Sequence, residues 1–91
     1  MLAIKREKSF LKDMAKVKMS DTQYAKYISY LSKLIHKEIL PPQSYDHPLS
    51  GEWSDAREFH IGGDLLVIYM LTLDTLIPIR IGSHAQLFKN M

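Results

Sequence analysis

The sequence predicts an α+β fold, in which two N-terminal helices pack on one face of a largely antiparallel four-stranded sheet. Apolar residues recur at helical spacing up to residue 40, whereas residues 55–83 carry strand-like alternation and apolar runs separated by turn residues. At 91 residues, 46% of them hydrophobic and 24% charged, the chain is expected to form a single domain over residues 1–91.

The composition narrows the class of protein. The chain has no cysteine, which excludes disulfides and thiolate metal sites and favours a reducing compartment. Its first residues, MLAIKREK, contain no apolar signal region, and no apolar run reaches membrane-spanning length, so we expect a cytoplasmic protein. Residues 1–40 carry nine Lys and Arg against four Asp and Glu, whereas residues 41–91 carry three against six. A basic helical half can face a polyanion, although lysines more often only solvate helix faces.

The N-terminal half predicts a short strand at residues 1–4 and two helices. The first helix, from about residue 7, is predicted by an apolar stripe: Phe10, Leu11, Met14 and Val17. Ser20 and Gln23 have the spacing of a capping box, so a second helix begins next to Ser20 and ends before Pro41. Its stripe, expected to face the core, is Tyr24, Tyr27, Ile28, Leu31, Leu34 and Ile35.

The C-terminal half predicts three strands in hairpin succession after a proline-rich loop at residues 41–53. The first strand, from residue 55, turns at Gly62 and Gly63 into an apolar central strand at residues 65–71. In the last strand Ile77, Ile79 and Ile81 are expected to face the core. The last strand also contains Pro78, which implies a bulge or an edge position, and residues 84–88 are expected to form a final helical turn.

Strand parity also predicts a site. If Phe59 and Ile61 face the helices, His60 faces the opposite side, and the same argument places Arg80 there. Three more polar residues, near strand ends or in the loop, can reach the same rim. The candidate catalytic residues are His47, His60, Asp64, Arg80 and His84.

Such a group suits the cleavage of RNA through its own 2′-hydroxyl. This reaction needs a base, an acid and a cation for the charge that develops on the phosphate. Histidines titrate near neutrality, and arginine offers a fixed fork of donors to phosphate oxygens. Asp64 could orient an imidazole, and Phe88 is the best candidate for stacking on a base, although a core role for it is about as common.

Two other interpretations use the same residues. Three histidines with Asp64 are legitimate zinc ligands, but their spacing matches no compact ligand motif. The histidines could also be incidental surface residues of a structural or interaction domain.

Three ordered motifs cover residues 46–88: DHPLSGEW, then REFH followed by GDLLVIY, then RIGSHAQLF. Together they resemble the YafQ branch of the RelE/ParE toxin superfamily, and the helical half fits that family's layout. The resemblance implies a RelE-like microbial RNase fold and a bacterial type II toxin. Such a toxin is a ribosome-dependent endoribonuclease that cleaves mRNA in the A site, using the RNA's 2′-hydroxyl and neither metal nor cofactor.

The resemblance also implies roles for individual residues. Arg80 matches the arginine that stabilises the phosphate and binds substrate, and Phe88 the aromatic that helps to hold the substrate. Leu65 follows Asp64 where some members carry tryptophan, so no stacking role is carried over to that position. Which histidine acts as acid and which as base stays open. The positions that match catalytic ones are His47, His60, Asp64 and His84, with Arg80 beside them.

The expected partners follow from the same resemblance. A cognate antitoxin, acidic and flexible, would cover the toxin, and the basic helices would contact rRNA while the site acts on mRNA in the ribosome. Operator DNA would be bound only through the antitoxin complex, and no membrane is expected. The alternative function is that of a non-catalytic ParE-like toxin, which inhibits a target such as gyrase by binding it.

Overall fold

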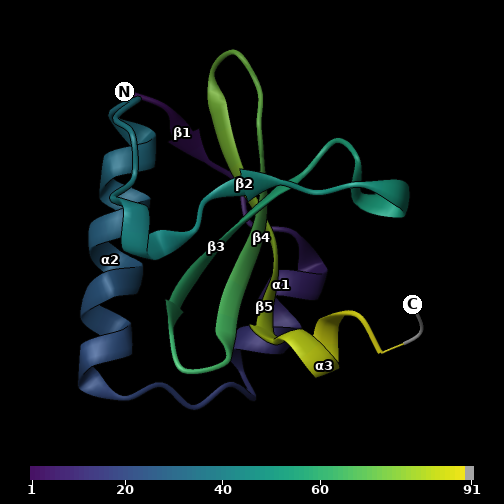
Figure 1. The fold of residues 1–91 in the computed structure, drawn as a ribbon. Coiled ribbons are helices and arrows are strands. Elements are labelled where there is room, and N and C mark those ends of the chain that lie inside the picture. Colours follow the sequence, from purple (N-terminus) through teal and green to yellow (C-terminus); the bar gives the residue numbers. More distant parts are fainter. Residues whose placement is uncertain (90–91) are drawn as a thin grey trace.

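The fold, seen in a computed structural model that describes residues 1–89, belongs to the α+β class, as predicted (Figure 1). The strands are β1 (Ala3–Ile4), β2 (His47–Pro48), β3 (Arg57–Gly62), β4 (Leu65–Leu71) and β5 (Thr75–Ser83). The helices are α1 (Lys8–Met14), α2 (Asp21–Ile35) and α3 (His84–Leu87), with the short 3-10 turns η1 (Pro42–Ser44) and η2 (Gly51–Trp53). Within the described residues, no helix is long and apolar enough to span a membrane.

The sheet has five strands over residues 1–89, in the order β1-β5-β4-β3-β2, where four were predicted. The additional strand is β2, which lies in the segment expected to be a loop and pairs antiparallel with β3. It contains only two residues, one of them Pro48, so it has no alternating pattern, and proline is tolerated there because β2 is an edge strand. At the other edge β1 pairs parallel with β5, which makes the sheet mixed.

The helices α1 and α2 cover one face of the sheet, as predicted. The predicted capping box at the start of α2 is confirmed: Ser20 accepts from the backbone N–H of Gln23, whose side chain accepts from the Ser20 N–H. The buried stripe is rotated from the predicted one, because Tyr24 is 51% and Ile28 50% exposed. The core on this face contains Phe10, Tyr27, Tyr30, Leu34, Phe59, Ile61, Val67, Tyr69 and Ile81.

A β-bulge in β5 changes the parity of that strand. Ile68 pairs with Arg80 but the next residue of β4, Tyr69, pairs with Pro78, so Ile79 is the extra residue. Of the bulge or edge position expected from Pro78, the bulge is therefore confirmed. The expected core direction is wrong for Ile79, which packs on the face away from α2, and for Ile77, which pairs with Met70 of that same face. The carbonyl of Ile79 accepts a 2.6 Å hydrogen bond from the Ser9 hydroxyl of α1.

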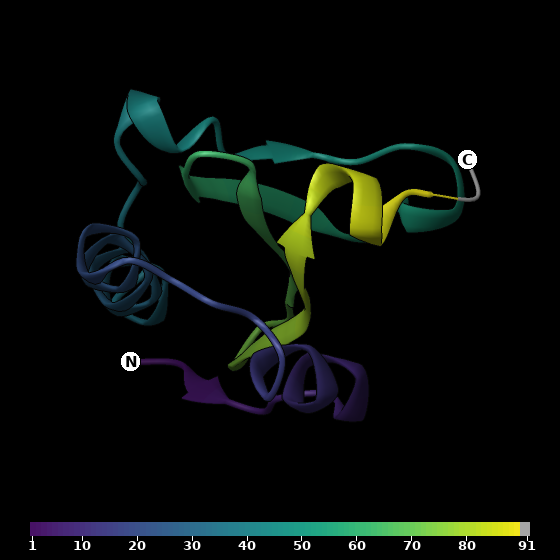
Figure 2. The same cartoon turned by 90° about the horizontal axis from the view of Figure 1, so that it is seen from below.

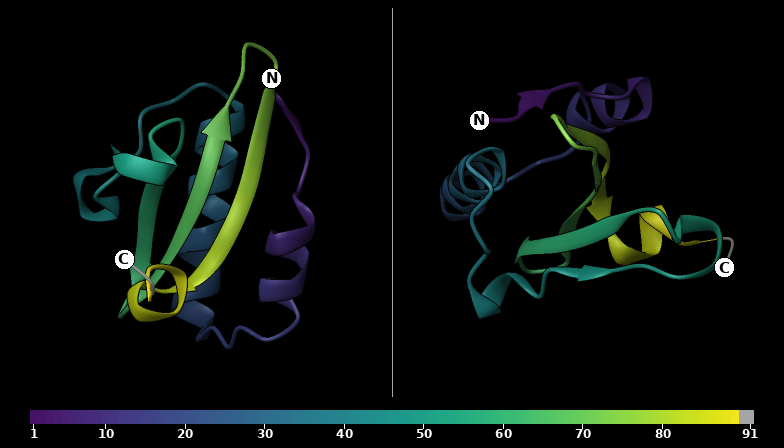
Figure 3. Two further views of the ribbon diagram at one scale, coloured as in Figure 1. Left: turned by 90° about the vertical axis from the view of Figure 1, so that its right-hand side faces the viewer. Right: turned by 90° about the horizontal axis from the view of Figure 1, so that it is seen from above.

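The second face of the sheet carries α3, the predicted final helical turn. In the left view of Figure 3, α3 lies in front of the strand ends and α2 lies behind the strands. Figure 2 shows β2 passing along β3 on the side of the sheet away from α1. A small apolar cluster fills this side: Ala56, Leu66, Ile68 and Leu87, with Leu49, Trp53, Met70, Ile79 and Phe88 against it.

Candidate functional site

On the second face of the sheet, one row of paired residues runs across four strands. His47 of β2 pairs with Glu58 of β3, Glu58 with Ile68 of β4, and Ile68 with Arg80 of β5. Residues paired across neighbouring strands point to the same face. The row therefore places two polar side chains at one end and an arginine at the other, with the buried Ile68 between them.

Glu58 is the central residue of the site. Its side chain is 4% exposed, and its Oε2 lies 2.7 Å from His60 Nε2 and 3.6 Å from His47 Nε2. A buried carboxylate is costly unless it is paired, and here two imidazoles supply the partners. Glu58 shares a strand face with His60 but was not among the predicted site residues. The spacing of two residues along one strand was the signal that could have identified it.

Asp46 anchors the strand that carries His47. Its Oδ1 accepts a 2.5 Å hydrogen bond from the Tyr69 hydroxyl and a 3.3 Å bond from Arg57 Nε. Burial, reinforced by this contact with Asp46, raises the pKa of Tyr69, so its hydroxyl remains a donor. The fixed position of Asp46 determines where the next side chain, His47, lies.

The ring of His47 is held at both nitrogens. Its Nδ1 lies 2.5 Å from the carbonyl oxygen of Tyr45, and its Nε2 faces the Glu58 carboxylate. The carbonyl oxygen can only accept, so Nδ1 carries an N–H in the contact with Tyr45, whereas the 3.6 Å separation at Nε2 is longer than a hydrogen bond. Tyr45 itself lies in the left-handed region with φ 49°, and its ring is edge-on to that of His60 at 5.9 Å.

His47 and His84 line one pocket from opposite elements. The pocket has a volume of about 470 Å³ and also includes Glu58, Ser50, Ala85 and Phe88. His84 is the first residue of α3, whose start is capped by a box between Ser83 and Gln86. The capped turn brings Phe88 beside His84, with ring centroids 4.6 Å apart, and Trp53 meets Phe88 edge-on at 6.4 Å. Phe88 thus both packs on the second cluster and borders the pocket.

The other three predicted residues lie outside the lining of this pocket. His60 is next to it, on the far side of Glu58, with its ring 6.4 Å from that of His47. Asp64 lies exposed in the turn between β3 and β4, beyond the row that carries Glu58. Asp64 precedes Leu65, whose strand partner Ser83 precedes His84, so the turn that carries Asp64 lies at the same end of the sheet as His84.

Arg80 shares the face of Glu58 but is turned toward α1. Its Nε lies 2.6 Å and one terminal nitrogen 3.2 Å from the carboxylate of Asp13, which also accepts the backbone N–H of Ile81 at 3.0 Å. Hydrogen bonding to Asp13 raises the pKa of Arg80, so the guanidinium stays charged. The sequence analysis missed Asp13, which lies 67 residues from Arg80 in the chain.

The zinc alternative does not fit this placement. Over residues 1–89 no three histidine or carboxylate side chains are grouped closely enough to hold a metal ion. The residues that the alternative would need are separated, because Asp64 lies in the exposed turn while His47 and His84 line the pocket.

Comparison with known proteins agrees with the motifs. Residues 2–89 match the family described as the bacterial toxin of type II toxin-antitoxin system, YafQ. The mRNA interferase toxin YafQ of Escherichia coli K12 is 43% identical over 63 residues, which is 67% of this chain and 68% of that protein.

Two solved structures share the fold over nearly the whole chain. YafQ from E. coli BL21(DE3) superposes with a TM-score of 0.82 at 32% identity, covering 97% of this chain and 99% of that one. The toxin in the E. coli DinJ–YafQ complex gives 0.80 at 33% identity, with 97% and 99% covered. The family match, the ordered motifs and the shared fold together show that this chain belongs to the YafQ family of bacterial type II toxin–antitoxin toxins.

Proposed function

We propose that this toxin is an endoribonuclease that cleaves mRNA on the ribosome, with His47 and His84 as the acid and base. The observation that carries the proposal is that these two imidazoles line one open pocket of about 470 Å³. The E. coli relatives are named mRNA interferase toxins, in keeping with this chemistry.

The reaction needs two proton transfers. A base removes the proton of the RNA 2′-hydroxyl, whose oxygen attacks the adjacent phosphorus, and an acid protonates the 5′-oxygen that leaves. The products are a 2′,3′-cyclic phosphate and a free 5′-hydroxyl. His47, whose two ring nitrogens both face acceptors, suits the acid. His84, whose ring lies against Phe88 at the mouth of the pocket, suits the base.

Glu58 and His60 hold His47 in position: Glu58 faces the His47 ring, and His60 contacts Glu58. The Glu58 carboxylate faces Nε2 of His47 and helps to orient the ring, as carboxylates orient histidines in catalytic triads. His60 donates to the same carboxylate and fixes its orientation. In this arrangement His60 acts through Glu58, and Arg80 and Phe88 bind the substrate. Asp64, in the turn before β4, lies at the end of the sheet that carries His84 and stays a candidate for orienting that ring.

The partners belong to this proposal as well. The E. coli toxin has been solved in complex with DinJ, and we expect a cognate antitoxin to cover the same pocket here. The ribosome would hold the mRNA, with rRNA against the basic α1 and α2, and operator DNA would be bound through the antitoxin. These partners place the toxin in the bacterial cytoplasm. A gyrase-binding toxin, the alternative, has no use for two imidazoles in one pocket.

The proposal is tested by the chemistry of the cleaved ends. Ribosome-bound mRNA that carries one 2′-deoxynucleotide immediately 5′ to the cleaved bond should remain intact at that bond. The unmodified mRNA should give a 2′,3′-cyclic phosphate and a 5′-hydroxyl. Cleavage at the deoxy position would show that the nucleophile is not the RNA's own hydroxyl and would refute the mechanism.

A further inference from the structure

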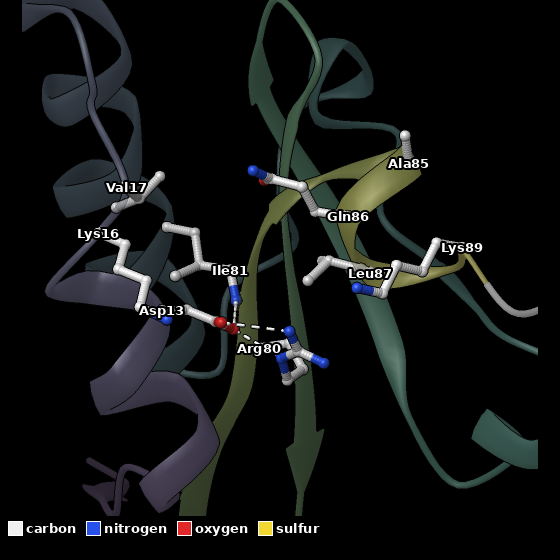
Figure 4. Close-up of a pocket in the computed structure, with 9 residues that line it drawn as sticks. All are labelled: Asp13, Lys16, Val17, Arg80, Ile81, Ala85, Gln86, Leu87 and Lys89. Carbon is white, nitrogen blue, oxygen red and sulfur yellow. Dashed lines mark hydrogen bonds and ion pairs between the residues drawn. The ribbon is translucent and has the colours of Figure 1, made fainter.

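A second pocket is lined by residues of α1, β5 and α3, and Figure 4 shows these side chains. Its volume is about 380 Å³, and its charged lining residues are Asp13, Lys16, Arg80 and Lys89. Three of these side chains are cationic and one is anionic, so the pocket attracts anions. Figure 4 shows the Arg80 guanidinium between the carboxylate of Asp13 and the side of Leu87, with Lys89 beyond it.

Arg80 keeps free donors in this pocket. A guanidinium has five N–H groups in a planar fork, and Asp13 occupies one on Nε and one on a terminal nitrogen. The remaining N–H groups are fixed in direction by this pairing, and the side chain is 30% exposed. Asp13 is held in turn by the backbone N–H of Ile81, so the pair is built into the junction of α1 and β5.

The single turn of α3 separates this pocket from the histidine pocket. His84 and Phe88, four residues apart, face the histidine pocket, whereas Gln86 and Leu87 face the second one. Ala85 lines both. Because alanine is small, an extended RNA strand has room to cross α3 here from one pocket to the other.

Resting on the proposed function, we infer that the second pocket binds a backbone phosphate of the RNA that flanks the scissile one. Arg80 donates to that phosphate with a guanidinium positioned by Asp13, and Lys16 and Lys89 neutralise it. The inference departs from the expectation that Arg80 contacts the scissile phosphate. Arg80 lines the second pocket, whereas His47 and His84 line the other.

The contents of the pocket favour a phosphate over a base. Its described lining contains no aromatic side chain on which a base could stack, and its apolar residues are Val17, Ile81, Ala85 and Leu87. Arginine beside lysines is the combination that proteins use for phosphate oxygens.

The test compares the affinities of short, uncleavable RNA analogues that contain different numbers of backbone phosphates. A dinucleotide with a 2′-deoxy first sugar offers only the scissile phosphate. Two tetranucleotides extend it by two nucleotides on the 5′ or the 3′ side. Affinities come from NMR titration of the full chain, with amides of Ile81 and Leu87 reporting the second pocket and the rings of His47 and His84 reporting the first.

For the wild type, one tetranucleotide should bind more tightly than the dinucleotide and shift the Ile81 amide. The variant that combines Lys16→Ala and Lys89→Ala should bind that tetranucleotide roughly fivefold more weakly than the wild type does. Its affinity for the dinucleotide should equal that of the wild type. Lys12→Ala removes one positive charge from an exposed position on α1 outside the pocket. This variant should still bind the tetranucleotide more tightly than the dinucleotide, as the wild type does.

Three results would overturn the inference: no gain from either extension, a gain that the double variant keeps, or an equal loss of affinity for the dinucleotide and the tetranucleotide. The third would place the cations at the scissile phosphate. Failure of the proposed function gives a different pattern, in which no analogue shifts the rings of His47 or His84 whatever happens at Ile81.

Discussion

The buried carboxylate of Glu58 lies 2.7 Å from His60 Nε2, and the same oxygen faces His47 Nε2 at 3.6 Å. One negative charge therefore orients two imidazoles on neighbouring strands. Since only His47 of these two lines the histidine pocket, Glu58 links a supporting histidine to a reacting one.

Glu58→Gln should slow mRNA cleavage roughly 10- to 100-fold, because the amide keeps the shape of the side chain but loses the charge that orients the two imidazoles. Cleavage in a reconstituted translation reaction measures the effect. Glu52→Gln, at an exposed position in η2, is the matched control and should cleave at the wild-type rate. Thermal melts show whether the variant is folded, and a folded variant with unchanged activity would remove Glu58 from the mechanism.

Tyr69→Phe should lower the free energy of unfolding by about 1 kcal/mol at neutral pH, because Asp46 loses the hydroxyl that donates to it. It should also change the alkaline limb of the stability curve. Burial raises the pKa of Tyr69 in the folded state, so folded protein keeps a proton that the unfolded chain loses. The corresponding stability is complete below the unfolded value of 10.0 and is lost as pH rises above it.

Urea unfolding between pH 8 and pH 11 measures this slope. It should be shallower in Tyr69→Phe but not flat, because burial also raises the pKa of Tyr27. Equal slopes in Tyr69→Phe and wild type would show that Tyr69 does not carry the effect.

Cleavage should depend on the ribosome. The histidine pocket is shallow, with His84 exposed and His47 about half exposed, so it positions RNA weakly by itself. Substrate held by the ribosome should react at least about 100-fold faster than the same free RNA, because positioning can supply several orders of magnitude in rate. Equal rates would mean that the toxin binds its substrate unaided.

Much of the fold followed from local patterns. The capping box of Ser20 and Gln23, the central strand β4 and the final turn α3 depend on neighbouring residues and were predicted correctly. The bulge at Ile79 was expected from Pro78, but its effect on parity was not, since it depends on which residues of β4 pair with β5. β2 was missed because its pairing with β3 leaves no pattern in two residues.

In the candidate site, too, the features set by local pattern were predicted and those set by tertiary contacts were not. Parity correctly placed His60 and Arg80 on the face opposite α2, but it could not show that Asp13 turns Arg80 into a separate pocket. That ion pair joins α1 to β5 and exists only after the tertiary fold has formed. Asp64 was expected near the rim because it lies just past a strand end, and it lies in the turn before β4, outside the lining of the histidine pocket.

The central claim is that His47 protonates the leaving oxygen and His84 removes the attacking proton. The most direct measurement is ribosome-bound cleavage of an mRNA whose scissile linkage has sulfur in place of the leaving 5′-oxygen. A thiolate leaves without a proton because its conjugate acid is far stronger than that of an alkoxide. His47→Ala should lose roughly 100-fold or more on normal mRNA and regain most of it on the sulfur linkage, whereas His84→Ala should remain slow on both. Rescue of His84→Ala would reverse the two roles, and rescue of neither would contradict the account.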